Sequence, residues 1–241
     1  MGKVVIILDY NNIFTSDTCT PEDIECTLGT VVQESLTYFS DITECYIRIY
    51  GGWYQNGILT GRSSEIMQKF SSICPIPDTF AGRSILGDIT FVEQIYGVEH
   101  SWRNTYREKP GPRLIPRRDV HRPHCVGKKN ECPVELLSKF TKKESKVCHI
   151  EGCNTVYRDV FSQYGQKMVD TMMVCDILTY GEEEDTIAIY VLTDDVDLYP
   201  SLALCRSKFP EVYLSIGIRN QYSQPERELL CNSFGINCIS I

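Results

Sequence analysis

A run of six apolar residues followed at once by acidic ones constrains this chain more than any other feature. Residues 187–192 read Ile-Ala-Ile-Tyr-Val-Leu, and residues 193–197 read Thr-Asp-Asp-Val-Asp. An unbroken apolar run predicts a strand at the centre of a sheet covered on both faces, because a half-exposed strand would alternate apolar and polar residues. The acidic residues would then stand at the rigid carboxyl end of a central strand.

Three carboxylates this close together repel one another. Two unit charges about 4 Å apart repel by roughly 4 kcal/mol at an effective dielectric constant near 20. A divalent cation would offset this repulsion. In the alternative interpretation, Asp197 caps the following helix and the other two carboxylates are solvated. The motif alone does not separate these two interpretations.

Strands and helices alternate along most of the 241 residues. The predicted strands cover residues 3–8, 44–50, 155–161, 187–192, 212–216 and 237–241. The predicted helices cover residues 21–39, 63–73, 167–180, 197–209 and 224–234, and Thr20 is the expected cap of the first. The alternation predicts one α/β domain with a doubly wound, mainly parallel sheet and helices on both faces. The length is sufficient for a substantial core.

Residues 80–154 break this alternation and are predicted to form an insertion within the single domain of residues 1–241. Short strands are expected at residues 89–92 and 94–96, but residues 103–124 are rich in Arg, Pro and Gly. Residues 101–150 contain 13 Lys and Arg against 5 Asp and Glu, whereas the remainder contains 11 against 27. A basic segment beside an acidic body fits a protein that binds a phosphate backbone, although basic loops can also be merely soluble.

Arginine and aromatic residues of the insertion are the best candidates for binding nucleic acid. They include Arg113, Arg117 and Arg118, with Trp102 and Tyr106 nearby. Arginines contact phosphates, and aromatic rings stack on the bases of single strands. Tyr50 and Trp53, after the second predicted strand, are expected to add stacking surface. The alternatives are a solvated loop for the basic residues and core packing for the aromatic ones.

Four cysteines and three histidines cluster within residues 121–153. The cysteines are Cys125, Cys132, Cys148 and Cys153, and the histidines are His121, His124 and His149. This clustering predicts a structural zinc site formed by the cysteines, which would explain how an otherwise unpatterned insertion folds. The alternative is that these are reduced thiols packed as small apolar side chains.

The chain is expected to be cytoplasmic, without membrane contact. No apolar run approaches the roughly 18 residues that span a bilayer. Met1-Gly2-Lys3 leads directly into the first predicted strand, without the small-residue cleavage site of a signal peptide. Association with a second copy or with a partner protein stays open.

Four carboxylates can meet at one site if the strand order reverses between the first strand and the strand of residues 187–192. Asp9 ends the first strand, Asp170 lies in the first turn of a predicted helix, and Asp195 and Asp197 follow the central strand. Ligands of doubly wound sheets bind beyond the carboxyl ends of the strands at such a reversal. The alternatives are a favourable first-turn acid for Asp170 and a turn-forming side chain for the neighbouring Asn12.

These motifs, taken in order, resemble the NYN domains of the PIN-like nuclease superfamily. The motifs are Asp9-x-x-Asn12, Lys167-x-x-Asp170, Asp176, and Thr193-x-Asp195-x-Asp197-Leu198 with Pro200. The resemblance covers residues 1–75 and 155–241, and not the basic insertion. Three positions depart from the family pattern: Met168 and Asp194 replace the usual Gly, and Val196 replaces the usual Ser.

The resemblance implies divalent-metal-dependent cleavage of RNA, as by an endoribonuclease. Mg²⁺ or Mn²⁺ would be held by the four carboxylates, because hard oxygen ligands suit these ions better than zinc. Asn12 and Thr193 would orient ligands or substrate, and Lys167 would contact phosphate. Asp176 is expected only to support the site, because six helical residues turn about 600°, which leaves it about 120° from the face of Asp170.

Two other functions stay open at this point. The first is a zinc-stabilised RNA-binding or assembly module whose NYN body no longer cleaves, an interpretation favoured by Asp194 and Val196. The second is a phosphohydrolase on another α/β fold. A haloacid-dehalogenase-like enzyme would need Asp-x-Asp where this chain has Asp9-Tyr10-Asn11. A dinucleotide enzyme is disfavoured because no Gly-x-Gly-x-x-Gly follows the first strand.

Overall fold

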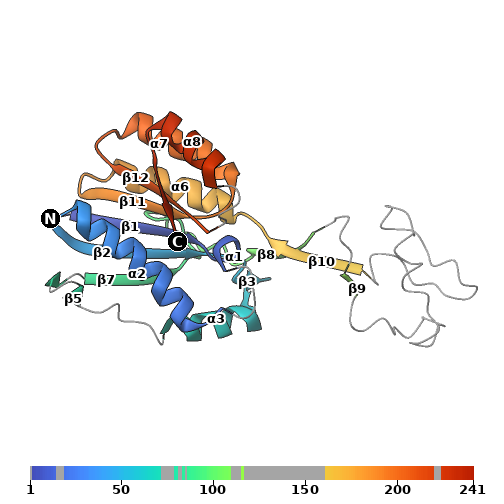
Figure 1. The fold of residues 1–241 in the computed structure, drawn as a ribbon. Coiled ribbons are helices and arrows are strands. Elements are labelled where there is room, and N and C mark those ends of the chain that lie inside the picture. Colours follow the sequence, from blue (N-terminus) through green and yellow to red (C-terminus); the bar gives the residue numbers. More distant parts are fainter. Residues whose placement is uncertain are drawn as a thin grey trace, which may run out of the picture. The chain divides into compact units, whose positions relative to one another are not determined.

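The computed structural model describes residues 2–14, 19–71, 79–80, 83–84, 86–109, 115–116, 161–219 and 224–241. Within this part of the chain, six strands form a parallel sheet (Figure 1). They are β1 (Gly2–Asp9), β2 (Ile42–Tyr50), β7 (Leu86–Phe91), β11 (Thr186–Leu192), β12 (Tyr213–Ile218) and β13 (Asn237–Ser240). Every pairing between neighbours in this sheet is parallel, as predicted.

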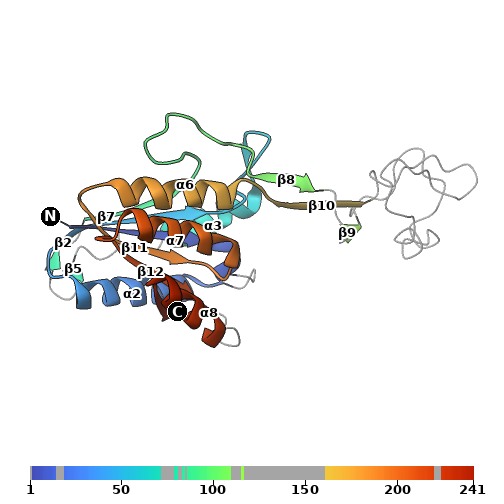
Figure 2. The ribbon, with the colours of Figure 1, turned by 90° about the horizontal axis from the view of Figure 1, so that it is seen from above.

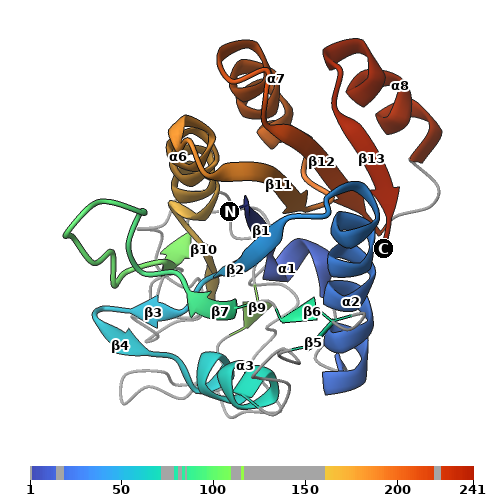
Figure 3. The ribbon, with the colours of Figure 1, turned by 90° about the vertical axis from the view of Figure 1, so that its left-hand side faces the viewer.

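The strand order is β13-β12-β11-β1-β2-β7, and Figure 3 shows β1 between β11 and β2. From β1 the chain moves outward through β2 to β7, returns to β11 on the other side of β1, and moves outward again. The order therefore reverses between β1 and β11, which meets the condition for bringing Asp9 close to residues 193–197. Leu8 pairs with Leu192 in the register, so both strands end at the same level.

The helices follow the predicted pattern closely. In the described part of the chain they are α1 (Tyr10–Ile13), α2 (Pro21–Tyr38), α3 (Gly61–Ser71), α6 (Val169–Glu182), α7 (Tyr199–Lys208), α8 (Gln224–Phe234) and the 3-10 helix η1 (Val196–Leu198). Thr20 caps α2 as expected: its hydroxyl accepts from the Asp23 N–H, and the Asp23 carboxylate accepts from the Thr20 N–H. This reciprocal pair satisfies two N–H groups that lack partners within the helix.

Two hydrophobic clusters cover the two faces of the sheet. Val4, Ile6 and Leu8 pack with residues of α2 and α3, whereas Val5 and Ile7 pack with residues of α6 and α7. Figure 2 shows α2 and α6 on opposite sides of the sheet. Because successive side chains of a strand point to opposite faces, the next odd-numbered residue after Ile7 lies on the α6 side. That residue is Asp9.

The boundaries of the second structural unit differ from the predicted insertion of residues 80–154. The chain divides into two compact units: a body, Met1–Thr105 with Gln166–Ile241, and a unit of Tyr106–Gly165. The body includes β7, which pairs with β2 at the edge of the main sheet. It also contains the hairpin of β3 (Tyr54–Gln55) and β4 (Ile58–Leu59), and the pair β5 (Thr79–Phe80) and β6 (Arg83–Ser84).

A separate three-stranded sheet has the order β8-β10-β9. Its strands are β8 (Tyr106–Lys109), β9 (Ile115–Pro116) and β10 (Phe161–Gln166). The strand predicted at residues 155–161 meets β10 only at Phe161, and residues 155–160 lie outside the described residues. Residues 94–96 form bends and turns, so the prediction of a strand there was wrong. None of the described helices combines the length and apolar character needed to cross a membrane.

Candidate active site

The candidate site begins where β1 and β11 end side by side. Asp9 is the last residue of β1, and the short helix α1 follows at once and carries Asn12 back toward it. Thr193 follows β11 directly and, like Asp9, is fully buried. The parallel register of the two strands therefore places a carboxylate and a hydroxyl from distant parts of the chain in contact.

The side chains of Asn12 and Thr193 both donate to the same oxygen of Asp9. Asn12 Nδ2 donates to Asp9 Oδ2 over 2.5 Å, and Thr193 Oγ1 donates to the same oxygen over 3.4 Å. Oδ1 is buried and has no hydrogen-bond partner among the described residues. Buried polar atoms nearly always have a partner, so an unpaired carboxylate oxygen makes Asp9 a candidate for binding a ligand or an ion.

Burial raises the pKa of Asp9 from 3.8 to about 6. The hydrogen bond from Asn12 opposes this rise, and the negative charge of Asp170 adds to it. Asp170 lies in the first turn of α6 and is exposed. A carboxylate raises the pKa of a second carboxylate only when the two lie close together. The effect of Asp170 on Asp9 therefore places the two side chains within electrostatic range of each other.

The backbone before α6 has an unusual conformation at Met168. This residue has φ 66° and ψ −6°, in the left-handed region that favours glycine. A glycine would adopt this conformation at a lower cost in free energy than Met168 does. The turn directs the chain from Lys167 into the helix that carries Asp170.

The segment after β11 is organised by Thr193 and Asp195. The Asp195 N–H donates to Thr193 Oγ1 over 3.0 Å, and Asp195 Oδ1 accepts from the Asp197 N–H over 2.9 Å. The Thr193 hydroxyl therefore links Asp9 to the backbone of Asp195. Asp195, rather than Asp197, is the cap of η1, which corrects the alternative interpretation of this motif. The Asp197 side chain is exposed.

Asp194 forms an ion pair with a residue of α8. Its Oδ1 lies 2.9 Å from Arg227 Nη1, and both side chains are largely buried. Arg227 therefore neutralises the extra charge that Asp194 brings to the segment. The three acids of the opening motif thus differ in environment: Asp194 in an ion pair, Asp195 as a cap and Asp197 exposed.

The four carboxylates of the candidate site do not all lie together in the part of the chain that the structure describes. Within this part, no three Asp, Glu, His or Cys side chains converge at the distances needed to hold a metal ion. The structure brings together Asp9, Asn12 and Thr193 and places the charge of Asp170 near Asp9. It does not collect all four predicted carboxylates around one point.

No family model, curated protein or solved structure matches the chain. The chemistry of the site and its place in the fold are therefore the basis for inferring a function.

Asp176 forms a buried ion pair with Arg48. The sequence predicted a supporting role for Asp176 but did not predict its partner. Its carboxylate accepts from Arg48 Nε over 2.6 Å, from the Tyr50 hydroxyl, and from the Tyr96 N–H over 2.8 Å. Arg48 also donates to the carbonyl oxygen of Gln94 over 2.7 Å. This network ties α6 to β2 and to the segment after β7. Arg48 interrupts the otherwise apolar end of β2, and a buried charge needs a partner of opposite charge. This position could therefore have predicted a buried ion pair from the sequence.

The predicted stacking role of Tyr50 and Trp53 does not agree with their burial. Tyr50 is 1% exposed and Trp53 is 2% exposed. The Tyr50 hydroxyl donates to Asp176, and the Trp53 indole N–H donates to the carbonyl oxygen of Ile49 over 3.1 Å. Neither ring offers a face to a base, so the alternative interpretation as core residues is correct for both. Tyr50 is hydrogen-bonded to Asp176 of α6, and the Trp53 ring packs against Phe91 of β7.

Lys167 remains a candidate for binding phosphate. Its side chain is exposed, while its N–H donates to the carbonyl oxygen of Thr105 over 2.8 Å. The predicted arginines of the insertion and the predicted zinc ligands lie outside the described residues. They are Arg113, Arg117, Arg118, Cys125, Cys132, Cys148 and Cys153.

Proposed function

We propose that this chain is a divalent-metal-dependent ribonuclease of the kind that the NYN resemblance implies. The observation that carries the proposal is the state of Asp9. Its carboxylate is fully buried at the point where the strand order reverses, with one oxygen held by Asn12 and Thr193 and the other without a partner among the described residues. Ligand sites of doubly wound sheets lie at this point of the fold.

The residues that would hold Mg²⁺ or Mn²⁺ are Asp9, Asp170, Asp195 and Asp197. The unpaired Oδ1 of Asp9 fits a hard cation, which would also offset the repulsion between Asp9 and Asp170. When bound, the ion would lower the pKa of a water molecule and neutralise charge on the phosphate. Such a site would hydrolyse a phosphodiester bond.

The remaining residues would position this chemistry. Asn12 and Thr193 donate to Oδ2 of Asp9 and so fix the orientation in which Oδ1 is presented. Thr193 also holds the backbone of Asp195. Lys167, exposed beside the first turn of α6, would contact a phosphate of the substrate.

The basic segment of residues 101–150 supports RNA as the partner. Its excess of Lys and Arg stands in contrast to the acidic remainder of the chain. Arg113, Arg117 and Arg118 would bind the phosphate backbone, and zinc held by the four cysteines of the insertion would stabilise their fold. We propose that the enzyme acts in the cytoplasm.

Labelled single-stranded RNA and DNA, incubated with the full chain in Mn²⁺, Mg²⁺ or EDTA, test this function. We expect cleavage of RNA that requires Mn²⁺ or Mg²⁺ and is lost in Asp195→Asn. Asp194→Asn is the matched control, because Asp194 is paired with Arg227. Cleavage that survives both EDTA and Asp195→Asn would contradict the mechanism. Binding of RNA without cleavage would favour the alternative, an RNA-binding or assembly module.

A further inference from the structure

A hydrogen bond between two side-chain amides joins two segments that directly adjoin the candidate site residues in the sequence. Asn11 Nδ2 is 2.8 Å from Oε1 of Gln166. Asn11 belongs to α1, and Gln166 is the last residue of β10. The bond joins segments that are 155 residues apart in the chain and that both lie in the body.

Each amide of this pair is close in the sequence to residues assigned to the site. Asn11 stands between Asp9 and Asn12, which are hydrogen-bonded to each other. Gln166 directly precedes Lys167 and comes four residues before Asp170. The main chain thus places both amides within four residues of Asp9, Asp170 or Lys167, and we infer that a nucleotide whose phosphate lies against these three residues reaches the amide pair.

The pair retains hydrogen-bonding groups after its internal bond is made. Each amide has one carbonyl oxygen and two N–H donors, so a single bond leaves one carbonyl oxygen and three N–H donors, whichever residue donates. No other hydrogen bond of either side chain occurs within the described residues, and both side chains are only half-buried. The pair thus offers an acceptor and donors, held in a fixed relation to each other.

We propose that Asn11 and Gln166 bind the ribose 2′-hydroxyl of the nucleotide beside the scissile phosphate and so select RNA over DNA. A 2′-hydroxyl both donates and accepts a hydrogen bond, and it is the group by which a protein distinguishes RNA from DNA at a given position. It is attached to the sugar next to the phosphate, whereas a base edge lies farther away. The placement of the phosphate rests on the proposed function.

Binding and cleavage should both be measured with the full chain. The probes are an RNA oligonucleotide, the DNA of the same sequence, and the RNA with 2′-deoxy sugars introduced one at a time. Affinities are measured in Mn²⁺ with Asp195→Asn as the common background of every chain compared, in which the proposed cleavage is lost, and rates are measured in Mn²⁺ without that substitution. The variants are Asn11→Ala, Gln166→Ala and the double variant. Gln33→Ala is the control, an exposed amide on α2, which packs on the opposite face of the sheet from α6.

We expect the wild-type chain and Gln33→Ala to favour RNA over DNA by about 10-fold, as a net gain of one or two hydrogen bonds predicts. The double variant should bring this ratio close to one, with a smaller effect on binding of DNA. One 2′-deoxy position, beside the cleaved phosphate, should reproduce most of the effect in the wild-type chain.

Loss of the RNA preference in the double variant would support the inference even if no substrate is cleaved, so it can be distinguished from the proposed hydrolysis. An unchanged ratio in the double variant would overturn it, whether or not RNA is cleaved. So would equal wild-type affinity for RNA and DNA, or a change of base preference without a change of sugar preference. A wild-type chain that binds neither nucleic acid overturns both proposals.

Discussion

Asn12 Nδ2 lies 2.5 Å from Oδ2 of Asp9 and holds one side of a carboxylate that has no solvent exposure. Burial of this acid is unfavourable, as its raised pKa shows. A buried carboxylate with a raised pKa, placed where ligands of doubly wound sheets bind, is a candidate catalytic or metal-binding group. The predictions below follow from this arrangement and from the ion pairs around it.

The first prediction concerns the stability of the protein without metal. The pKa of Asp9 is 3.8 when unfolded and about 6 when folded, so the folded state keeps its proton to higher pH. Stability is therefore lost as the pH rises from about 4 to about 6, by up to about 3 kcal/mol. Asp9→Asn lacks this loss. In urea unfolding with EDTA, the free energy of unfolding of Asp9→Asn minus that of the wild-type chain should increase over this pH range and stay constant above it. A constant difference would show that Asp9 has no raised pKa.

The second prediction concerns stabilisation by metal. A ligand that binds only the folded state at 100 times its dissociation constant adds about 2.7 kcal/mol to the free energy of unfolding. For a body of this size, that raises the melting temperature by roughly 5–10 °C. Mg²⁺ or Mn²⁺ should produce this rise in the wild-type chain and in Asp194→Asn, but not in Asp9→Asn. Equal rises in all three proteins would place the metal elsewhere.

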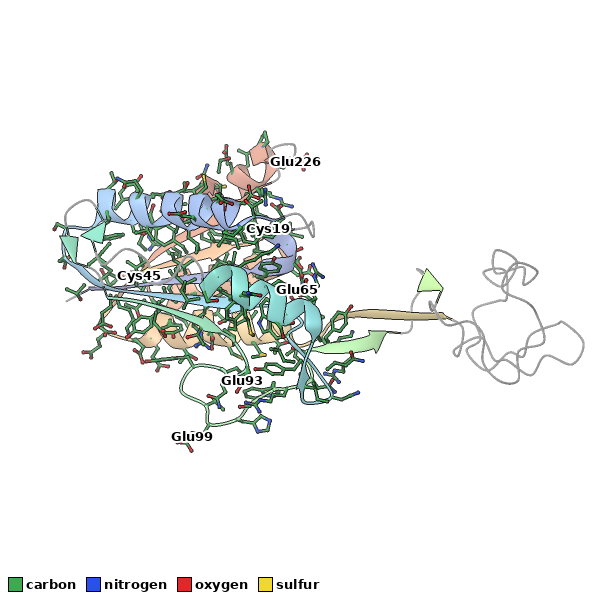
Figure 4. The ribbon with its side chains drawn as sticks, turned by 90° about the horizontal axis from the view of Figure 1, so that it is seen from below. Cys19, Cys45, Glu65, Glu93, Glu99 and Glu226 are labelled. Atoms are coloured by element: carbon green, nitrogen blue, oxygen red, sulfur yellow. The ribbon has the colours of Figure 1, made fainter. Side chains whose placement is uncertain are left out.

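The third prediction compares two ion pairs. Asp176→Asn leaves Arg48 buried without a counter-charge and should cost about 3–5 kcal/mol. Glu93 lies in the segment after β7 (Figure 4). It forms an ion pair with Arg103, and both side chains are partly exposed. Glu93→Gln should therefore cost about 1 kcal/mol or less. Denaturant unfolding measures both costs, and similar values for the two variants would show that the Asp176 network does not anchor α6.

The fourth prediction concerns the insertion. If its four cysteines hold a structural metal, elemental analysis of the purified chain should find about one zinc ion per molecule. Replacement of Cys125 and Cys132 by Ser should remove most of it. Cys26, which is exposed on α2, provides the control substitution. A well-folded preparation that contains no zinc would remove the zinc site from the account.

The sequence was a sufficient guide wherever a local pattern determines the structure. The apolar runs of β1 and β11, and the Thr20 cap before Pro21, predicted elements that the structure confirms. The sequence also predicted that Asp9 and Asp195 would be neighbours if the strand order reverses between these two strands. The order does reverse there, and Thr193 donates to Asp9 and accepts from the Asp195 N–H. In each case the signal lies within a few consecutive residues.

The sequence was a poor guide where distant partners decide. β7 reads Leu-Gly-Asp-Ile-Thr-Phe and looked like part of the insertion, because an edge strand lacks a continuous apolar run. Tyr50 looked like a surface aromatic residue, but Asp176, 126 residues away, binds its hydroxyl in the core. Similarly, no local pattern shows that Lys167 is tied to Thr105.

The rate of RNA cleavage by Asp9→Asn tests the central claim most directly. The substitution preserves the size of the side chain and removes the charge that would hold the metal. In saturating Mn²⁺, we expect Asp9→Asn to cleave at least about 100-fold more slowly than the wild-type chain, a loss of about 2.7 kcal/mol of transition-state stabilisation, while Asp194→Asn stays within a few-fold of it. Cleavage by Asp9→Asn at the wild-type rate would contradict the claim that this carboxylate is part of the active site.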